Sequence, residues 1–295
     1  MKKMFMAVIA LMMTIGVSAQ FYIYCSNGNV IKVDSISMIA PGEPEHPDPS
    51  AGIGMFSVSA DKQVTFSKGN LQYHPANDEW RFAENQTDYI GDANSNCSST
   101  YNGWLDLFGW STSSTNFGVS TSEDDNDYLG IFIDWGINQI GVDAPKTWRT
   151  LSKDEWVYLF ETRTNAISLY GVAQVAGMNG MVLLPDNWVA PTGVTFKAGL
   201  HTDDVSDYSV YQSFTSGQWA KMEQAGAVFL PASGRRFGMD MNDGLVGYIG
   251  LYWSSTEDDY YNDFVYDVYF DIRALFPKGS FVRHLGRAVR LVKDL

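Results

Sequence analysis

Cysteine and histidine are scarce in this chain, and their scarcity excludes several kinds of site. Cys25 and Cys97 are the only cysteines among 295 residues, too far apart to form a zinc knuckle. An oxidising compartment permits a disulfide between them, and two unpaired thiols are the equal alternative. No Gly-x-Ser-x-Gly elbow, His-Glu-x-x-His motif or phosphate loop occurs around the four histidines or elsewhere. The sequence therefore predicts no catalytic residue, no metal ligand and no cofactor.

Positive charge is also in short supply. The chain has 20 lysines and arginines against 34 aspartates and glutamates, which gives a net charge of −14. Such a surface repels phosphate groups, so we expect no nucleic-acid partner. A glycosidase that uses a pair of carboxylates stays open, because its two acids need not lie close together in the sequence.

Only one long hydrophobic run is present, and it lies at the N-terminus. Lys2 and Lys3 precede the apolar residues 4–17, and the run ends in the small residues Val17-Ser18-Ala19. This pattern is typical of a signal peptide over residues 1–19, cleaved after Ala19, and the run is too short to span a bilayer well. No cysteine follows the cleavage site directly, so we expect a secreted, periplasmic or surface protein without a lipid anchor or a transmembrane segment.

Residues 20–50 are expected to form a unit of their own. β-prone residues at 21–24 and 30–33 flank Asn27-Gly28, a pair that suits a tight turn, so residues 20–40 predict a β-hairpin. A lone hairpin is at best marginally stable in water and has to dock on a neighbour. Four prolines within residues 41–50 predict an extended linker, which places the main domain at 51–295.

Aromatic and apolar residues are plentiful. The chain is 45% hydrophobic and 14% aromatic, ample for a sizeable core. Ser152 and Glu155 form a capping box that begins a helix ending near Arg163, and Ser216 is expected to cap a second helix that ends at Ala225. Apolar patterns predict short strands at 55–60, 63–67, 71–73, 80–82, 181–184 and 227–230. Two helices among many short strands predict an α+β fold.

The segment 87–138 is rich in Gly, Ser, Asn and Asp, yet it holds large aromatic residues such as Trp104, Trp110 and Trp135. We expect a long irregular segment that these side chains pin to the core. Its acidic run, Glu123–Asp127, lacks the spacing of an EF-hand loop, and we interpret it as a solvated loop.

Four motifs occur in the order that is found in one group of proteins. Trp148-Arg-Thr-Leu-Ser-Lys-Asp-Glu-Trp156 resembles the Trp-Arg-Leu-Pro-Thr-x-x-Glu-Trp helix entry of the formylglycine-generating enzymes. The segments 230–236, 250–257 and 287–292 resemble later motifs of that group. They are still more similar to its non-enzymatic relatives, the secreted bacterial paralogues of the Fib-succ-major type. The resemblance covers residues 145–295 and implies a C-type-lectin-like fold of twisted antiparallel strands, two helices, long irregular loops and adjacent chain ends.

The sequence departs from both the enzymes and the sugar-binding lectins that share this fold. The formylglycine-generating enzymes hold copper with a pair of cysteines in their C-terminal half, and no cysteine follows Cys97 here. Calcium-dependent lectins carry Glu-Pro-Asn or Gln-Pro-Asp together with Trp-Asn-Asp, and neither set occurs. The resemblance therefore implies neither formylglycine-generating activity nor calcium-dependent sugar binding.

The stretch 248–295 is where we expect a ligand to bind. Its ends are apolar and β-prone, with a terminal strand expected over 288–292, and its middle is rich in Tyr and Asp, the composition of binding loops. The candidate ligand-binding residues are Asp258, Asp259, Tyr260, Tyr261, Asn262, Asp263, Tyr266, Tyr269, Arg273 and His284. The alternative is that every second residue of one strand faces the core, namely Phe264, Tyr266, Val268 and Phe270.

The leading hypothesis is a secreted, non-catalytic binding or adhesion module that presents this surface to a protein or glycan. The resemblance adds a narrower form, because the target proteins of diversity-generating retroelements share the fold and vary this surface. One alternative is an envelope hydrolase, which requires convergent carboxylates or a histidine in a deep pocket. The other is a structural surface subunit whose N-terminal hairpin docks on a neighbour.

Overall fold

The computed structural model describes residues 21–24, 30–33, 54–203, 206–241 and 245–295. The chain divides into two units, Met1–His46 and Pro47–Leu295. In the first unit, strands β1 (Phe21–Tyr24) and β2 (Val30–Val33) pair antiparallel. The signal peptide expected at 1–19, the linker expected at 41–50 and Cys25 lie outside the described residues.

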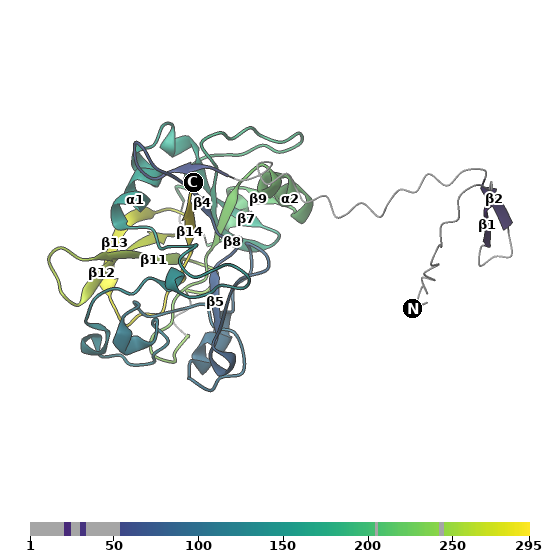
Figure 1. Ribbon diagram of the computed structural model, residues 1–295. Helices are drawn as coiled ribbons and strands as arrows, with labels where there is room; N and C mark the ends of the chain where they lie inside the picture. The colour runs from purple at the N-terminus through teal and green to yellow at the C-terminus, as the bar shows by residue number, and fades with distance from the viewer. Residues whose placement is uncertain (1–20, 25–29, 34–53, 204–205, 242–244) are drawn as a thin grey trace. The chain divides into compact units, whose positions relative to one another are not determined.

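The second unit has few helices and several small, mostly antiparallel sheets, which confirms the α+β prediction (Figure 1). The largest sheet has the strand order β10-β8-β7-β9, in which only β7 and β9 are parallel. Its strands are β7 (Tyr170–Val175), β8 (Met178–Leu183), β9 (Ser213–Phe214) and β10 (Val228–Pro231). A second sheet is the antiparallel meander of β11 (Gly250–Glu257), β12 (Phe264–Phe270) and β13 (Leu275–Val282).

Of two further sheets, one joins the start of the domain to its end and the other is a hairpin near the start. Strands β3 (Phe56–Ser57), β4 (Gln63–Phe66) and β14 (Val292–Asp294) form a sheet in the order β14-β4-β3. The chain end thus pairs antiparallel with one of the first strands, Val292 opposite Phe66. Strands β5 (Leu71–His74) and β6 (Glu79–Phe82) form the remaining hairpin.

Both expected helices form, and the start of the second differs by one residue. Ser152 and Glu155 make the capping box of α1 (Lys153–Val157), which continues as a π-helix over Tyr158–Thr162. Helix α2 (Ser216–Gln224) is capped by Thr215 and not by Ser216. The correction follows from the partner, because Gln218 lies three residues after Thr215 and completes a capping box with it. Short 3-10 helices occur at Pro75–Asn77, Gly91–Asn96, Ser113–Thr115, Asp125–Tyr128, Trp135–Ile137, Ala166–Ser168 and Tyr208–Val210.

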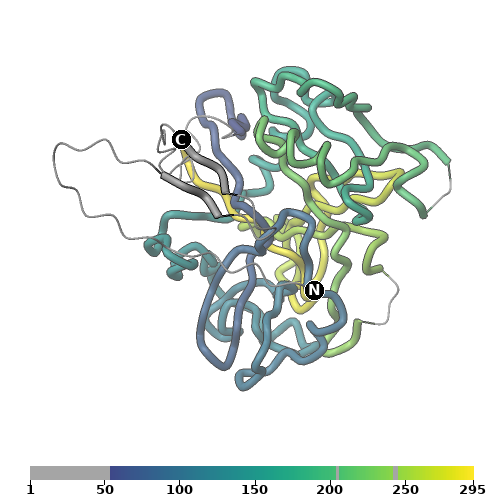
Figure 2. Tube along the Cα trace, turned by 90° about the vertical axis from the view of Figure 1, so that its right-hand side faces the viewer, coloured from purple at the N-terminus to yellow at the C-terminus, as the bar shows by residue number. Residues whose placement is uncertain are grey.

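The strand expected at 288–292 is wrong in extent, because β14 begins only at Val292. The preceding residues have no continuous partner strand and bond to a different segment at nearly every step. Figure 2 shows this yellow segment passing through the middle of the domain, beside the blue segment with which the described part of the domain begins. The backbone bonds are Arg287 with Phe108, Ala288 with Leu251 and Trp253, Val289 with Leu71, and Leu291 with Ser67.

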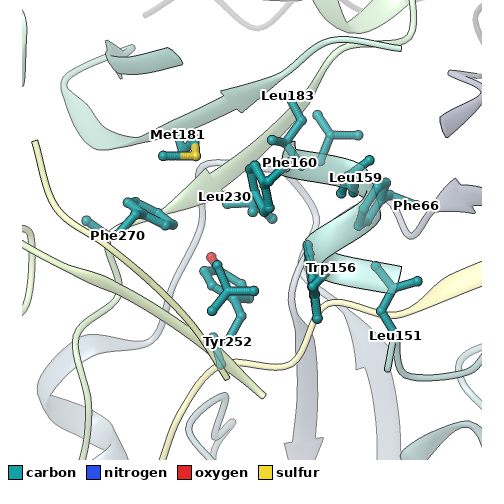
Figure 3. Packing of buried hydrophobic residues seen from close by; sticks show 14 of the residues in the cluster. Phe66, Leu151, Trp156, Leu159, Phe160, Met181, Leu183, Leu230, Tyr252 and Phe270 are labelled. Carbon is teal, nitrogen blue, oxygen red and sulfur yellow. The ribbon is translucent and has the colours of Figure 1, made fainter. Parts of the chain in front are cut away.

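The main core lies between α1, the β7–β10 sheet and the first two strands of the meander (Figure 3). Trp156, Leu159 and Phe160 fall on one face of the helical segment and are buried, as the 3,4-spacing predicts. Tyr252 of β11 and Phe270 of β12 stack with ring centroids 6.2 Å apart in the same core. The meander is therefore attached to the core by one face, which leaves the turn between β11 and β12 free to project.

Buried aromatic residues pin the irregular segment 87–138 to the core, as expected. Of the three tryptophans named above, two are buried. Trp110 and Trp135 are fully buried, and their indole nitrogens donate to the carbonyls of Ser254 (3.1 Å) and Phe117 (2.7 Å). Trp104 is only partly buried and lies under the guanidinium of Arg81, 3.7 Å from the ring centroid.

A buried carboxylate holds the same segment. Asp106 accepts hydrogen bonds from the amide of Ile90 and the side chain of Asn94, both at 2.8 Å. Burial raises the pKa of Asp106 from 3.8 to about 6, against the opposing effect of these hydrogen bonds. Cys97, nearby in the chain, is buried and has no disulfide partner among the described residues. No helix in the described part of the chain is both long and apolar enough to cross a membrane.

Candidate functional site

The turn 258–263 carries two large, strongly exposed residues among the predicted ligand-binding residues. It joins β11 to β12, and the side chains of Tyr260 and Tyr261 are 85% and 63% exposed. The ring of Tyr261 packs on that of Phe264 with centroids 5.5 Å apart, whereas no ring contact fixes Tyr260 among the described residues. The turn thus presents two large aromatic groups to solvent.

Hydrogen bonds accepted by one carboxylate fix the shape of this turn. Asp258 accepts from the amides of Tyr260 (2.8 Å) and Tyr261 (3.1 Å) and from the hydroxyl of Ser280 on β13 (2.5 Å). Slight burial acts to raise the pKa of Asp258, but these hydrogen bonds outweigh it and lower the pKa. A carboxylate that stays ionised holds the two tyrosines in one backbone conformation, which reduces the entropy lost on binding.

Asp259 ties the turn to helix α1. It accepts from Lys153 Nζ and from the hydroxyl of Tyr266, both at 3.2 Å. The same Lys153 ammonium lies 4.5 Å from the centroid of the Tyr266 ring. Asp259 and Tyr266 are therefore engaged within the protein, and we assign them to the support of the turn.

The other two residues of the turn line a polar hollow of about 750 Å³. Asn262 and Asp263 form one wall, and the acidic residues Glu123, Asp124 and Asp125 form the other together with Asn126 and Leu129. Figure 1 shows the teal loops of this segment at the same side of the domain as the β11–β12 turn. The acidic run 123–127, which we interpreted as a solvated loop, thus belongs to the site.

A histidine and an arginine connect the two walls from below. The amide of Arg283 donates to the carbonyl of Asp263 (3.1 Å), and its guanidinium lies 3.2 Å from the carboxylate of Glu257. His284 Nδ1 lies 2.8 Å from Asp125 Oδ1, an oxygen that the His284 amide also approaches at 3.3 Å. His284, which the sequence predicts as a ligand-binding residue, is only 7% exposed. It positions the acidic wall.

Phe237 extends the site beyond the hollow. It is exposed, and its ring meets the buried His284 ring edge-on with centroids 5.2 Å apart. Its neighbour Gly238 lies against Glu123, because a Cβ added to Gly238 would come within 2.3 Å of Glu123 Oε1. We name the surface formed by residues 123–129, Phe237 and the turn 258–263 the Tyr/Asp face.

Four of the ten predicted residues lie outside the Tyr/Asp face: Tyr266 and His284 support it, and Tyr269 and Arg273 line other hollows. Tyr269 is half-buried and donates to Asp271 (2.9 Å), and with Phe276 and Phe281 it lines a small apolar hollow of about 290 Å³. Arg273 lines another hollow, of about 380 Å³, with Tyr208 and Tyr248. A single binding surface therefore does not include all ten predicted residues.

The alternative arrangement of β12, with Phe264, Tyr266, Val268 and Phe270 facing the core, is half wrong. Val268 and Phe270 are buried, but Phe264 and Tyr266 are partly exposed. The reason is a bulge between Asp267 and Tyr269, which shifts the register against β13 and reverses the alternation.

Beneath the face lies a fully buried ion pair between Arg287 and Asp267. The guanidinium of Arg287 is stacked between two rings, 4.6 Å from the centroid of Trp253 and 4.6 Å from that of Phe281. Asp267 belongs to β12 and Arg287 to the closing segment, so the pair joins the meander that carries the turn to the strand-poor C-terminus.

The described residues contain no group of three or more His, Cys, Asp or Glu side chains arranged to hold a metal ion. The carboxylates of the hollow come from two walls and one of them already faces a histidine. The chemistry that the face offers is therefore hydrogen bonding, negative charge and aromatic contact. Comparison of the chain with family models, curated proteins and solved structures finds no match.

Proposed function

We propose that this chain is a secreted, non-catalytic binding or adhesion module that binds a protein or glycan ligand at its Tyr/Asp face. The observation that carries the proposal is the fixed turn 258–263, which exposes Tyr260 and Tyr261 beside a polar hollow. Exposed tyrosines on a rigid backbone are the usual anchors of binding loops, because they lose little conformational entropy.

A C-type-lectin-like fold is part of this proposal. Its support is the pairing of β14 with β4 near the domain start, the presence of helices α1 and α2, and the long irregular segment 87–138. In the narrower form of the proposal, the turn 258–263 is the surface that a diversity-generating retroelement varies. A template repeat and a reverse-transcriptase gene beside the coding sequence would support that form, and their absence would end it.

Replacing both Tyr260 and Tyr261 with alanine is expected to weaken ligand binding at least about tenfold, because aromatic anchors dominate interface energies. The full chain, applied to arrays of glycans and of bacterial and host surface proteins, would first identify the ligand. Its affinity for the wild type and the double variant would then be measured by surface plasmon resonance.

The matched control is Tyr248→Ala, since Tyr248 is also half-exposed but lines the separate hollow beside Arg273. The proposal predicts that this variant binds as the wild type does. Equal binding by the wild type and the Tyr260, Tyr261 variant would remove the Tyr/Asp face as the site. Loss of binding only in Tyr248→Ala would move the site to the other hollow.

A further inference from the structure

Part of the negative charge on the Tyr/Asp face is not balanced by any residue that the structure describes. Glu123 and Asp263 lie on opposite walls of the hollow, and neither side chain has an ion-pair or hydrogen-bond partner among the described residues. No lysine or arginine is among the described residues that line the hollow. Two basic side chains lie at its walls and both are already engaged: His284 lies buried beside Asp125, and the Arg283 guanidinium pairs with Glu257. A ligand that enters the hollow therefore meets the carboxylates of Glu123 and Asp263, which have no counter-ion among the described residues.

Exposed apolar groups surround these carboxylates. Leu129 lines the hollow itself, Phe237 lies on the His284 ring, and Tyr260 and Tyr261 project from the turn. All four are exposed in a chain whose other large side chains mostly pack into three cores. Carboxylates and the open faces of tyrosine rings both attract ammonium and guanidinium groups, so a surface that combines them suits a ligand with such groups.

We infer that the ligand of the Tyr/Asp face is a protein segment that combines lysine or arginine with apolar side chains. The inference rests on the proposed function and narrows its ligand from a protein or glycan to one class. Charge complementarity favours a protein ligand over a glycan, because neutral sugars would leave Glu123 and Asp263 desolvated without a cation. The spread of the carboxylates over two walls fits the separate cations of a peptide better than one metal ion.

The test is a selection of random twelve-residue peptides, displayed on phage, against the immobilised full chain. The expected result is enrichment of peptides in which Lys or Arg lies next to aromatic or aliphatic residues. Synthetic copies of these peptides should bind Glu123→Gln/Asp263→Asn about tenfold more weakly than the wild type, with a steep dependence on salt.

The matched control is Glu84→Gln/Asp92→Asn. It removes the same two negative charges from exposed positions outside the hollow, so it corrects for non-specific attraction to an acidic protein. Peptides should bind this control as they bind the wild type. Enriched peptides without cations, or equal weakening in both double variants, would overturn the inference.

The outcome also separates the inference from the proposed function. If no peptide is enriched but a glycan binds in a manner that depends on Tyr260 and Tyr261, the ligand class is wrong and the proposed function stands. If neither a peptide nor an arrayed ligand depends on these tyrosines, both are wrong.

Discussion

Replacing Arg287 with alanine is expected to lower the free energy of unfolding by about 3–5 kcal/mol, the cost of leaving a buried charge without its partner. The partner, Asp267, is wholly inaccessible to solvent and lies on β12. Without the guanidinium, the carboxylate must either be ionised in an apolar surrounding or take up a proton. The variant also loses the stacking of Arg287 between Trp253 and Phe281, both 4.6 Å away. Urea unfolding, followed by tryptophan fluorescence, measures the effect.

Two controls separate the ion pair from a general loss of charge. Lys278→Ala removes an exposed cation of β13 and should change stability by no more than about 0.5 kcal/mol. A double variant, Arg287→Met with Asp267→Leu, replaces both charges by apolar groups and should be more stable than Arg287→Ala. An Arg287→Ala protein that unfolds at the same urea concentration as the wild type would show that the pair does not join the meander to the C-terminus.

The stability of the protein relative to its Asp106→Asn variant is expected to fall by about 3 kcal/mol as the pH rises from about 3 to about 8. Burial raises the pKa of Asp106 from 3.8 to about 6 in the folded state. Between these two values the folded protein retains a proton that the unfolded chain has released, so a rise in pH favours unfolding. Below about pH 3 both states are protonated, and well above pH 6 the full cost of the buried charge is present.

The variant carries no titrating group at this position, so the difference between the two proteins isolates the contribution of Asp106. The substitution also removes one acceptor oxygen from the pair of bonds made by Ile90 and Asn94. The loss of this acceptor changes the stability difference between the wild type and the variant by the same amount at every pH above 6. Urea unfolding at several pH values gives the curve, and a difference that does not change with pH would contradict a carboxylate buried at this position.

The sequence predicts local structure well wherever neighbouring residues determine it. The capping box of Ser152 and Glu155, the α1 face and the short strands of β4, β5 and β8 all follow from spacing alone. Thr215 was missed as a cap because Ser216, one residue later, has the same preference. The extent of β14 was missed because residues 287–291 look β-prone but find a different partner at nearly every step.

For the candidate site, the sequence indicated the exposed turn but not the contacts around it, and the reason is the same. Tyr260, Tyr261 and Asp258 lie where a polar run between two strands places them, at an exposed turn. The burial of His284 and the contribution of Glu123 depend on contacts between distant parts of the chain. His284 and Asp125, for example, lie over 150 positions apart. The hydrophobic periodicity of a sequence does not indicate such a long-range contact. Phe237 had no signal beyond being an apolar residue in a turn.

Hydrogen–deuterium exchange of the full chain, with and without its ligand, tests the central claim most directly. The claim is that one surface, built from the acidic wall and the tyrosine turn, makes the recognition contact. The predicted result is slower amide exchange on binding in two separate segments, 123–131 and 258–264. Slower exchange confined to the hollow lined by Tyr208, Tyr248 and Arg273, with no change in those segments, would contradict it.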